Sequence, residues 1–318
     1  DVTGGAPADN VHCRKSPGCL PVVPLVCTIF AAVISETAEI TRMKTLKFLM
    51  LGLAFAAGQC LWAAEPDTVA LTAVTQHETA IVKKKHSLEF TVNVQLPADE
   101  DSRLYTPVRS WAMGLLFGQT GLTLDDTTGT DSEVAERMAK AYVKRGKAEI
   151  TDLAKMSRRD GTDSRFNYAF DLSVQRVYET RRFITFVAET YNYAGGAHGV
   201  QTRVYATFVK ADGHRLTWDD IILPKRKAKF CGLVTDGLQD FFGVKGFAAL
   251  KERLLVDGKV SRTSFPLPKN GPGLLEDGLR VQYEAYEIAP YAAGQPLSVV
   301  PYSAMRGVWS KMGVSIWR

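Results

Sequence analysis

The sequence lacks the features that mark several protein classes. It has five cysteines in 318 residues, and its 26 glycines and 14 prolines are close to ordinary usage. Collagen-like, low-complexity and globally disordered classes are therefore excluded. The net charge of +5 is a mild surplus without a stripe of arginines and aromatic residues, so we expect no nucleic-acid partner.

Motifs of familiar catalytic and metal sites are also missing. No two histidines from residue 64 onwards have the spacing of a zinc helix or finger; these histidines are His77, His86, His198 and His214. There is no G-x-S-x-G nucleophile elbow, no P-loop and no G-x-G-x-x-G between a strand and a helix. We therefore expect no metal and no cofactor, and no hydrolase of familiar design is visible.

The first 63 residues have the pattern of an export signal. Two lysines after Met43 and an apolar run at 48–57 lead to Leu61-Trp62-Ala63, which is typical of a secretory signal peptide at 43–63. We predict cleavage after Ala63 and a periplasmic or secreted mature chain, 64–318. Residues 1–42 are expected to be upstream read-through without a fold.

A lipid anchor at Cys60 is the alternative to a free mature chain. Cys60 follows the apolar run as a lipid-modified cysteine would, although Gln59 is larger than the residue that lipoprotein processing prefers. The apolar run 20–34 is shorter than the roughly 20 residues needed to span a bilayer, and we expect no transmembrane helix in 64–318. Cys231 is then the one cysteine of the mature chain, and we interpret it as a small buried residue rather than a nucleophile.

Hydrophobic periodicity in the mature chain predicts an α+β fold: a largely antiparallel sheet with helices packed on it, in two sub-domains, 64–182 and 183–318. Alternating apolar residues predict strands at 90–96, 166–174, 177–191, 200–210, 279–283 and 297–300. Helical patterns predict helices at 111–117 with a cap at Thr106, from Asp131 or Ser132 to 156, from 217, at 228–255 with a break near Gly243 and Gly246, and after Pro301.

The segment 189–199 is the most unusual stretch of the chain. Gly195, Gly196 and Gly199 lie between two predicted hairpin strands, where they permit a close backbone approach and would present His198 to a ligand. The alternative is that the glycines only form the turn and that His198 bonds a neighbouring carbonyl.

A tyrosine-rich segment at 283–294 is the second candidate. Tyrosines beside proline and glycine form recognition surfaces because each ring offers apolar contact and a hydroxyl. The alternative is that these tyrosines pack in the core or on a sheet face. The basic runs 83–85 and 225–227 are expected to be solvated loops, with attraction for an anionic polymer as the alternative.

The two segments resemble the family named domain of unknown function 3298. The resemblance covers about 185–310 and rests on Tyr191–Gly199, on Asp212-Gly213 with Asp219-Asp220, and on Tyr286–Tyr291. By pattern, 75–180 resembles domain of unknown function 4163, which commonly precedes it. The same pair occurs in the ectodomain of a lysozyme-sensing anti-sigma factor and beside the catalytic domain of certain peptidoglycan deacetylases.

The resemblance implies a cell-envelope protein whose partner is lysozyme or a cell-wall glycan. Deacetylase activity does not carry over, because the T-F-D-D-G motif and the H-x-x-x-H pair of the catalytic domain are missing from this chain. Signalling is not carried over either.

Two functional hypotheses follow. The first is an exported binding module without a catalytic site, which binds lysozyme or peptidoglycan fragments through Tyr191, Tyr193, Gly195, Gly196, His198, Gly199, Tyr286 and Tyr291. The second is a hydrolase or transferase acting on the cell wall, with His198 as general base and Glu189, Asp219 or Asp220 as its orienting carboxylate. The second requires one of these carboxylates within hydrogen-bond reach of His198.

Overall fold

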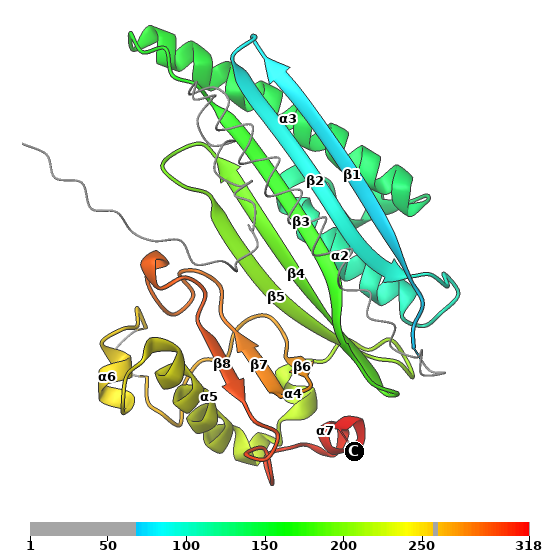
Figure 1. Cartoon of the computed structure of the whole chain (residues 1–318), viewed down its shortest axis with the longest axis vertical. Helices are drawn as coiled ribbons and strands as arrows, with labels where there is room; N and C mark the ends of the chain where they lie inside the picture. The colour runs from blue at the N-terminus through cyan, green and yellow to red at the C-terminus, as the bar shows by residue number, and fades with distance from the viewer. Residues whose placement is uncertain (1–67, 257–259, 318) are drawn as a thin grey trace, which may run out of the picture. The chain divides into compact units, whose positions relative to one another are not determined.

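The computed structural model describes residues 68–256 and 260–317. The predictions for 1–42, for the signal peptide at 43–63 and for Cys60 lie outside these residues. The described chain is α+β, as predicted, with a five-stranded sheet in the order β1-β2-β3-β4-β5 and a three-stranded sheet in the order β6-β7-β8 (Figure 1). None of the described helices is both long and apolar enough to cross a membrane.

The larger sheet is antiparallel except at one seam. Its strands are β1 (Leu71–Val82), β2 (His86–Pro97), β3 (Asn167–Glu179), β4 (Phe183–Ala194) and β5 (Val200–Val209). Strands β2 and β3 run parallel, with Ser87 opposite Asn167. The predicted strand at 177–191 is wrong at its start, because β3 continues to Glu179 and the chain turns before β4 begins.

Helices α2 (Tyr105–Thr120) and α3 (Asp131–Arg159) cover one face of this sheet (Figure 1). The strand residues that face them are buried, and Phe90 stacks on Phe170 at a ring-centroid distance of 5.7 Å in this core. Alternate residues of β3 point to the other face and are half-buried. The larger sheet therefore has one covered face and one partly open face.

Two predicted helix caps are wrong. Helix α3 is capped by Thr130, whose hydroxyl accepts a hydrogen bond from the Glu133 amide while the Glu133 carboxylate accepts one from the Thr130 amide at 2.9 Å. Helix α2 already includes Thr106, so that residue is no cap, and its N-terminus has no side-chain cap. The loop between the helices holds the 3-10 turn η1 (Leu124–Thr127).

A second hydrophobic cluster surrounds the three-stranded sheet. Its elements are α4 (Trp218–Ile221), η2 (Pro224–Arg226), α5 (Lys227–Phe242), α6 (Phe247–Lys251), β6 (Gly273–Leu275), β7 (Gly278–Gln282), η3 (Tyr291–Ala293), β8 (Leu297–Val300) and α7 (Lys311–Trp317). The predicted break is present, because Gly243 adopts a left-handed conformation (φ +63°) and ends α5. Turns follow Pro301, so the last helix begins later than predicted, at Lys311.

Two buried threonines join this cluster to the larger sheet. Thr185 on β4 donates a hydrogen bond to the Leu274 carbonyl at 2.8 Å, and Thr207 on β5 donates one to the Pro272 carbonyl at 2.9 Å. Thr207 also accepts the Leu274 amide at 3.1 Å. The predicted division at 182/183 stays a prediction; it falls at the start of β4, within one sheet.

Candidate functional site

The glycine loop connects β4 to β5. Gly195 (φ +86°) and Gly196 (φ +94°) adopt conformations that favour glycine, and the Tyr193 hydroxyl donates to the Gly196 carbonyl at 2.9 Å. Gly199 is required for a different reason, because a Cβ there would overlap the Tyr191 ring. Turn geometry and packing thus account for the glycines, as the simpler interpretation of the segment expects.

The tyrosines of the second segment divide into core and surface residues. Tyr283 is fully buried, donates to the Pro266 carbonyl at 2.7 Å, and has a pKa raised well above its usual value by burial. Tyr286 is 63% exposed and adopts a left-handed conformation (φ +69°), which is unusual for an aromatic residue. Its ring stacks on that of Tyr291 at a centroid distance of 5.6 Å.

The structure brings these two segments together. The His198 ring lies on the Tyr291 ring at a centroid distance of 4.4 Å and an interplanar angle of 12°. The Tyr291 hydroxyl donates to the Gly199 carbonyl at 2.6 Å, across 92 residues of sequence. His198, Tyr291 and Tyr286 therefore form a continuous stack, which we call the aromatic row.

The three carboxylates that the hydrolase hypothesis places beside His198 are not hydrogen-bonded to it. Glu189 accepts from Arg203 Nε at 2.7 Å, and Asp220 accepts from the Thr217 backbone amide at 2.7 Å and contacts His214 Nε2 at 2.9 Å. Asp219 is exposed in the short helix α4. Within the described residues, no hydrogen bond joins His198 to any of the three carboxylates, so the arrangement that a His198 base requires is not present there.

Asp220 is instead a cap with a low pKa. Burial alone would raise the pKa of this carboxyl, but the hydrogen bonds from the Thr217 hydroxyl and from His214 outweigh it and hold the pKa below its usual value. Asp220 closes a capping box with Thr217 at the start of α4. Its position is explained by helix capping.

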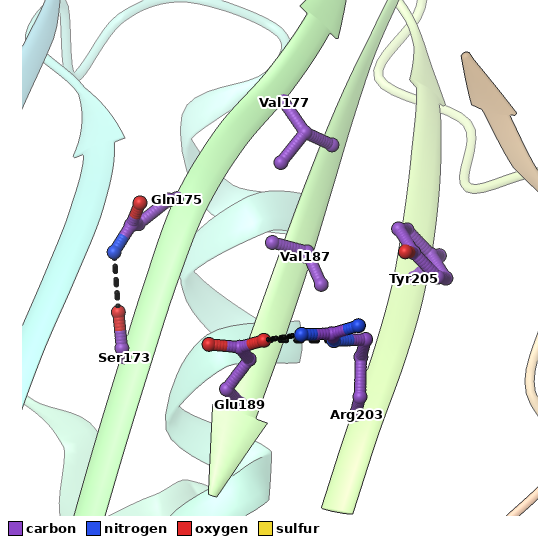
Figure 2. A pocket seen from close by; sticks show the side chains of 7 residues that line it. All are labelled: Ser173, Gln175, Val177, Val187, Glu189, Arg203 and Tyr205. Atoms are coloured by element: carbon purple, nitrogen blue, oxygen red, sulfur yellow. Dashed lines mark hydrogen bonds and ion pairs between the residues drawn. The ribbon is translucent and has the colours of Figure 1, made fainter. Parts of the chain in front are cut away.

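A hollow of about 300 Å³ lies on the partly open face of the larger sheet (Figure 2). It spans β3, β4 and β5, and its lining residues are Ser173, Gln175, Val177, Val187, Glu189, Arg203 and Tyr205. Figure 2 shows the Glu189–Arg203 ion pair between β4 and β5, and on β3 beside it a hydrogen bond of 2.8 Å from Gln175 to Ser173, which lies opposite Glu189. The hollow therefore offers hydrogen-bonding groups around two valines.

The hollow and the aromatic row are connected through β4 and β5. Glu189 and Tyr191 are two residues apart on β4 and so face the same side of the sheet. The Arg203 amide donates to the Gln295 side chain at 2.5 Å, and Gln295 follows the turn that holds Tyr291. The sequence did not single out Arg203 or Gln295, because a polar residue on a solvated strand or in a surface loop is common in any protein.

Metal-binding groups do not gather in the described part of the chain. Within residues 68–256 and 260–317, no three His, Cys, Asp or Glu side chains are placed to hold a metal ion together. Cys231 is buried and free, its thiol donates to the Phe265 carbonyl at 3.3 Å, and burial raises its pKa. A buried thiol with a raised pKa is a poor nucleophile.

Comparisons with known proteins give two family matches. Residues 125–201 match the family described as deacetylase PdaC, and 250–303 match the family described as protein of unknown function DUF3298. The predicted resemblance to DUF3298 is confirmed over a shorter range than the predicted 185–310. The resemblances to domain 4163 and to the anti-sigma ectodomain stay predictions. No curated protein matches the chain.

Solved structures share the fold at low identity. A DUF3298 family member from Bacteroides fragilis has a TM-score of 0.65 at 18% identity, covering 79% of this chain and 97% of that chain. A DUF3298 family protein from Pseudomonas aeruginosa has a TM-score of 0.52 at 13% identity, covering 77% of this chain and 96% of that chain. The fold and the two family matches together indicate a cell-envelope-associated domain of unknown function, with a PdaC-like region at 125–201 and a DUF3298 region at 250–303.

Proposed function

We propose that the chain is an exported binding module of the cell envelope that recognises a cell-wall glycan at the aromatic row. The stack of His198, Tyr291 and Tyr286 carries this proposal, because His198 and Tyr286 are exposed and the stack is assembled from two distant segments. Sugar rings have apolar C–H faces that pack on aromatic rings, and hydroxyls at their edges that need polar partners.

The row is preorganised for such a ligand. The hydrogen bond from Tyr291 to the Gly199 carbonyl fixes its central ring, and the bond from Tyr193 to Gly196 fixes the loop beside it. A ligand that meets fixed rings loses less free energy to ordering of the site than one that must assemble them. This supports binding at the row.

The hollow extends the site. Glu189 and Arg203 offer charged acceptors and donors, and Gln175 adds an amide, within reach of a ligand that leaves the row along β4. An extended saccharide with many hydroxyls matches this combination of stacked rings and dispersed polar groups. A compact apolar ligand does not match it, since polar side chains line the hollow beside its two valines.

Binding without turnover is favoured over catalysis at this site. No carboxylate among the described residues orients His198. The sequence also lacks the T-F-D-D-G and H-x-x-x-H motifs of the catalytic domain of the peptidoglycan deacetylases that it resembles elsewhere. The resemblance also implies lysozyme as a partner. No contact among the described residues favours lysozyme over a glycan, so lysozyme is the second ligand in the test.

The test is calorimetric titration of the purified full-length chain with soluble peptidoglycan fragments and, separately, with an animal-type lysozyme. Tyr286→Asn removes one ring of the row while keeping a residue that tolerates a left-handed conformation. We expect it to weaken glycan binding about three- to tenfold. Phe241→Ala is the matched control, because Phe241 is also an exposed aromatic residue, 42% exposed, but belongs to α5.

Each outcome decides between the hypotheses. Saturable heat with the fragments that weakens in Tyr286→Asn but not in Phe241→Ala supports the proposal. Saturable heat with lysozyme alone replaces the glycan by a protein partner. Release of acetate or of new reducing ends from the fragments, lost in His198→Ala, would establish the enzymatic alternative instead.

A further inference from the structure

A second cavity, of about 470 Å³, lies where β1 turns into β2 beside the last turn of α3. It does not belong to the aromatic row or to the hollow. Its lining includes Lys83, Lys85, His86, Ser157, Arg158 and Asp163. The charged side chains in this lining are three basic residues and one acidic residue, so the cavity is positive.

His86 supplies a buried donor to this cavity. The residue is 3% exposed, and its Nδ1 accepts the Phe166 backbone amide at 3.1 Å. Because Nδ1 is an acceptor, the ring proton lies on Nε2. Burial, and after it the charges of Lys85 and Lys83, lower the pKa of His86, which favours the neutral ring.

The His86 Nε2–H group has no hydrogen-bond partner within the part of the chain that the structure describes. Among the described residues, the fully buried side-chain atoms without a partner belong to Ser102, Arg280 and Ser298, so the His86 Nε2 is not sealed in the core and is open to the cavity. The group lines a cavity large enough to hold an acceptor. An oxygen atom of a ligand in the cavity can therefore accept a hydrogen bond from this group.

The surrounding cations are only partly neutralised. Lys85 pairs with the Asp163 carboxylate and also donates to the Asp163 carbonyl at 2.5 Å. Arg158 uses Nε to bond the Ala154 carbonyl at 3.1 Å, and its terminal nitrogens have no partner among the described residues. Lys83 likewise has none there. The cavity therefore holds two cationic groups that an anion can neutralise.

The turn that carries the lysines is strained. Lys83 (φ 51°) and Lys84 (φ 60°) are both left-handed, and a tight turn of this kind between two strands ordinarily has Asn-Gly. A non-glycine residue in this region is disfavoured by about 1 kcal/mol or more. Lysines at these positions thus weaken the turn and strengthen the charge beside the cavity.

We propose that this basic cavity binds a phosphate group, with His86 Nε2–H, Lys83 and Arg158 as its donors. Phosphate offers several oxygens in a tetrahedral arrangement, which suits donors that come from a turn, a strand and a helix. The cavity is larger than free phosphate needs, so it also accommodates a phosphate ester of a small sugar. This site does not depend on the glycan site proposed above.

The ion pair of Lys85 with Asp163 does not block the site. The Asp163 side chain is 85% exposed, and exposed ion pairs contribute little to stability. Lys85 can therefore exchange this partner for phosphate at little cost in free energy. Ser157 is already committed, since its hydroxyl donates to the Thr162 carbonyl at 2.9 Å and accepts the Ser164 amide at 3.1 Å.

The test titrates inorganic phosphate, and in parallel glucose 1-phosphate, into the purified full-length chain at constant ionic strength. The histidine ring signals are followed by ¹H–¹⁵N NMR and affinity by calorimetry. We expect a saturable shift of the His86 ring signals, and a loss of affinity of about threefold or more in Lys83→Gln and in Arg158→Gln. Lys84→Gln and Arg159→Gln are matched controls, because they remove the same charge from neighbouring exposed residues outside the cavity lining.

Equal or tighter binding of glucose 1-phosphate supports a phosphate ester as the ligand, and weaker binding supports free phosphate. The proposal is overturned if phosphate leaves the His86 signals unchanged, or if acetate shifts them equally at the same concentration. It is also overturned if the two control variants lose as much affinity as the two cavity variants, because binding would then follow net charge alone.

Discussion

Thr207 is the residue whose substitution best tests how the second hydrophobic cluster is attached to the larger sheet. It is fully buried, its hydroxyl donates to the Pro272 carbonyl, and it accepts the Leu274 amide. Thr207→Val replaces the hydroxyl by a methyl group of nearly the same size. The substitution thus removes hydrogen bonds while leaving the packing almost unchanged.

The magnitude follows from the groups that lose a partner. Thr207→Val leaves the Pro272 carbonyl and the Leu274 amide without these bonds, and each unsatisfied buried group costs about 1–3 kcal/mol. We expect the free energy of unfolding to fall by about 2–4 kcal/mol, less than the full sum because the two bonds share one oxygen. Thr207→Ser keeps the hydroxyl and loses one methyl group, for about 1 kcal/mol.

Urea unfolding followed by tryptophan fluorescence measures this difference. With a slope of about 3 kcal/mol per molar, the midpoint of Thr207→Val should fall by about 1 M, and that of Thr207→Ser by about a third as much. A midpoint for Thr207→Val within about 0.2 M of the parent, or equal losses in both variants, would refute the view that the hydroxyl secures this junction.

Three further predictions concern single positions. Gly199→Ala should destabilise the chain by about 1–3 kcal/mol in thermal unfolding, because its Cβ overlaps the Tyr191 ring, whereas Gly118→Ala meets no atoms in α2 and should stabilise it by about 0.5–1 kcal/mol. The folded state lowers the pKa of His86 from 6.5, so below pH 6.5 the unfolded chain binds a proton more readily than the folded chain does. The free energy of unfolding should therefore fall as the pH drops below 6.5. In urea titrations at several pH values, His86→Gln should reduce this dependence of stability on pH. Cys231, at 2% exposed, should resist a thiol reagent in buffer and react in urea, as mapped by mass spectrometry, and fast labelling in buffer would contradict its buried position.

Much of the fold could be predicted because its apolar residues alternate clearly. The predicted strand at 90–96 lies within β2, and that at 200–210 matches β5 except for its last residue, since one face of each is buried against the helices. Strand β1 was missed because only Val74 and Val82 of its twelve residues are buried. An edge strand rich in threonine and alanine lacks the contrast between faces on which such predictions depend.

The parallel seam and the aromatic row could not be predicted for a different reason. Successive strands joined by turn residues indicate antiparallel hairpins. Nothing in the local sequence of β2 therefore indicates that its parallel neighbour is β3, which begins at Asn167. Tyr291 and His198 were each candidates, but the stack between them is a contact over more than ninety residues, and local periodicity carries no information at that distance. For the basic cavity, the sequence predicts only a solvated loop at 83–85, because His86, which lines the cavity, shows no special pattern in the sequence.

The parallel pairing of β2 and β3 also sets an order for the assembly of the sheet. The pairs β1–β2, β3–β4 and β4–β5 join strands that follow one another in the chain, so they close short loops. Ser87 and Asn167 can pair only when the chain between them, which includes α2 and α3, has folded so that β3 reaches β2. Such contacts between residues far apart in the sequence slow folding. We therefore expect the ribbon β1–β2 and the ribbon β3–β4–β5 to form early, and their junction under the two helices to form late.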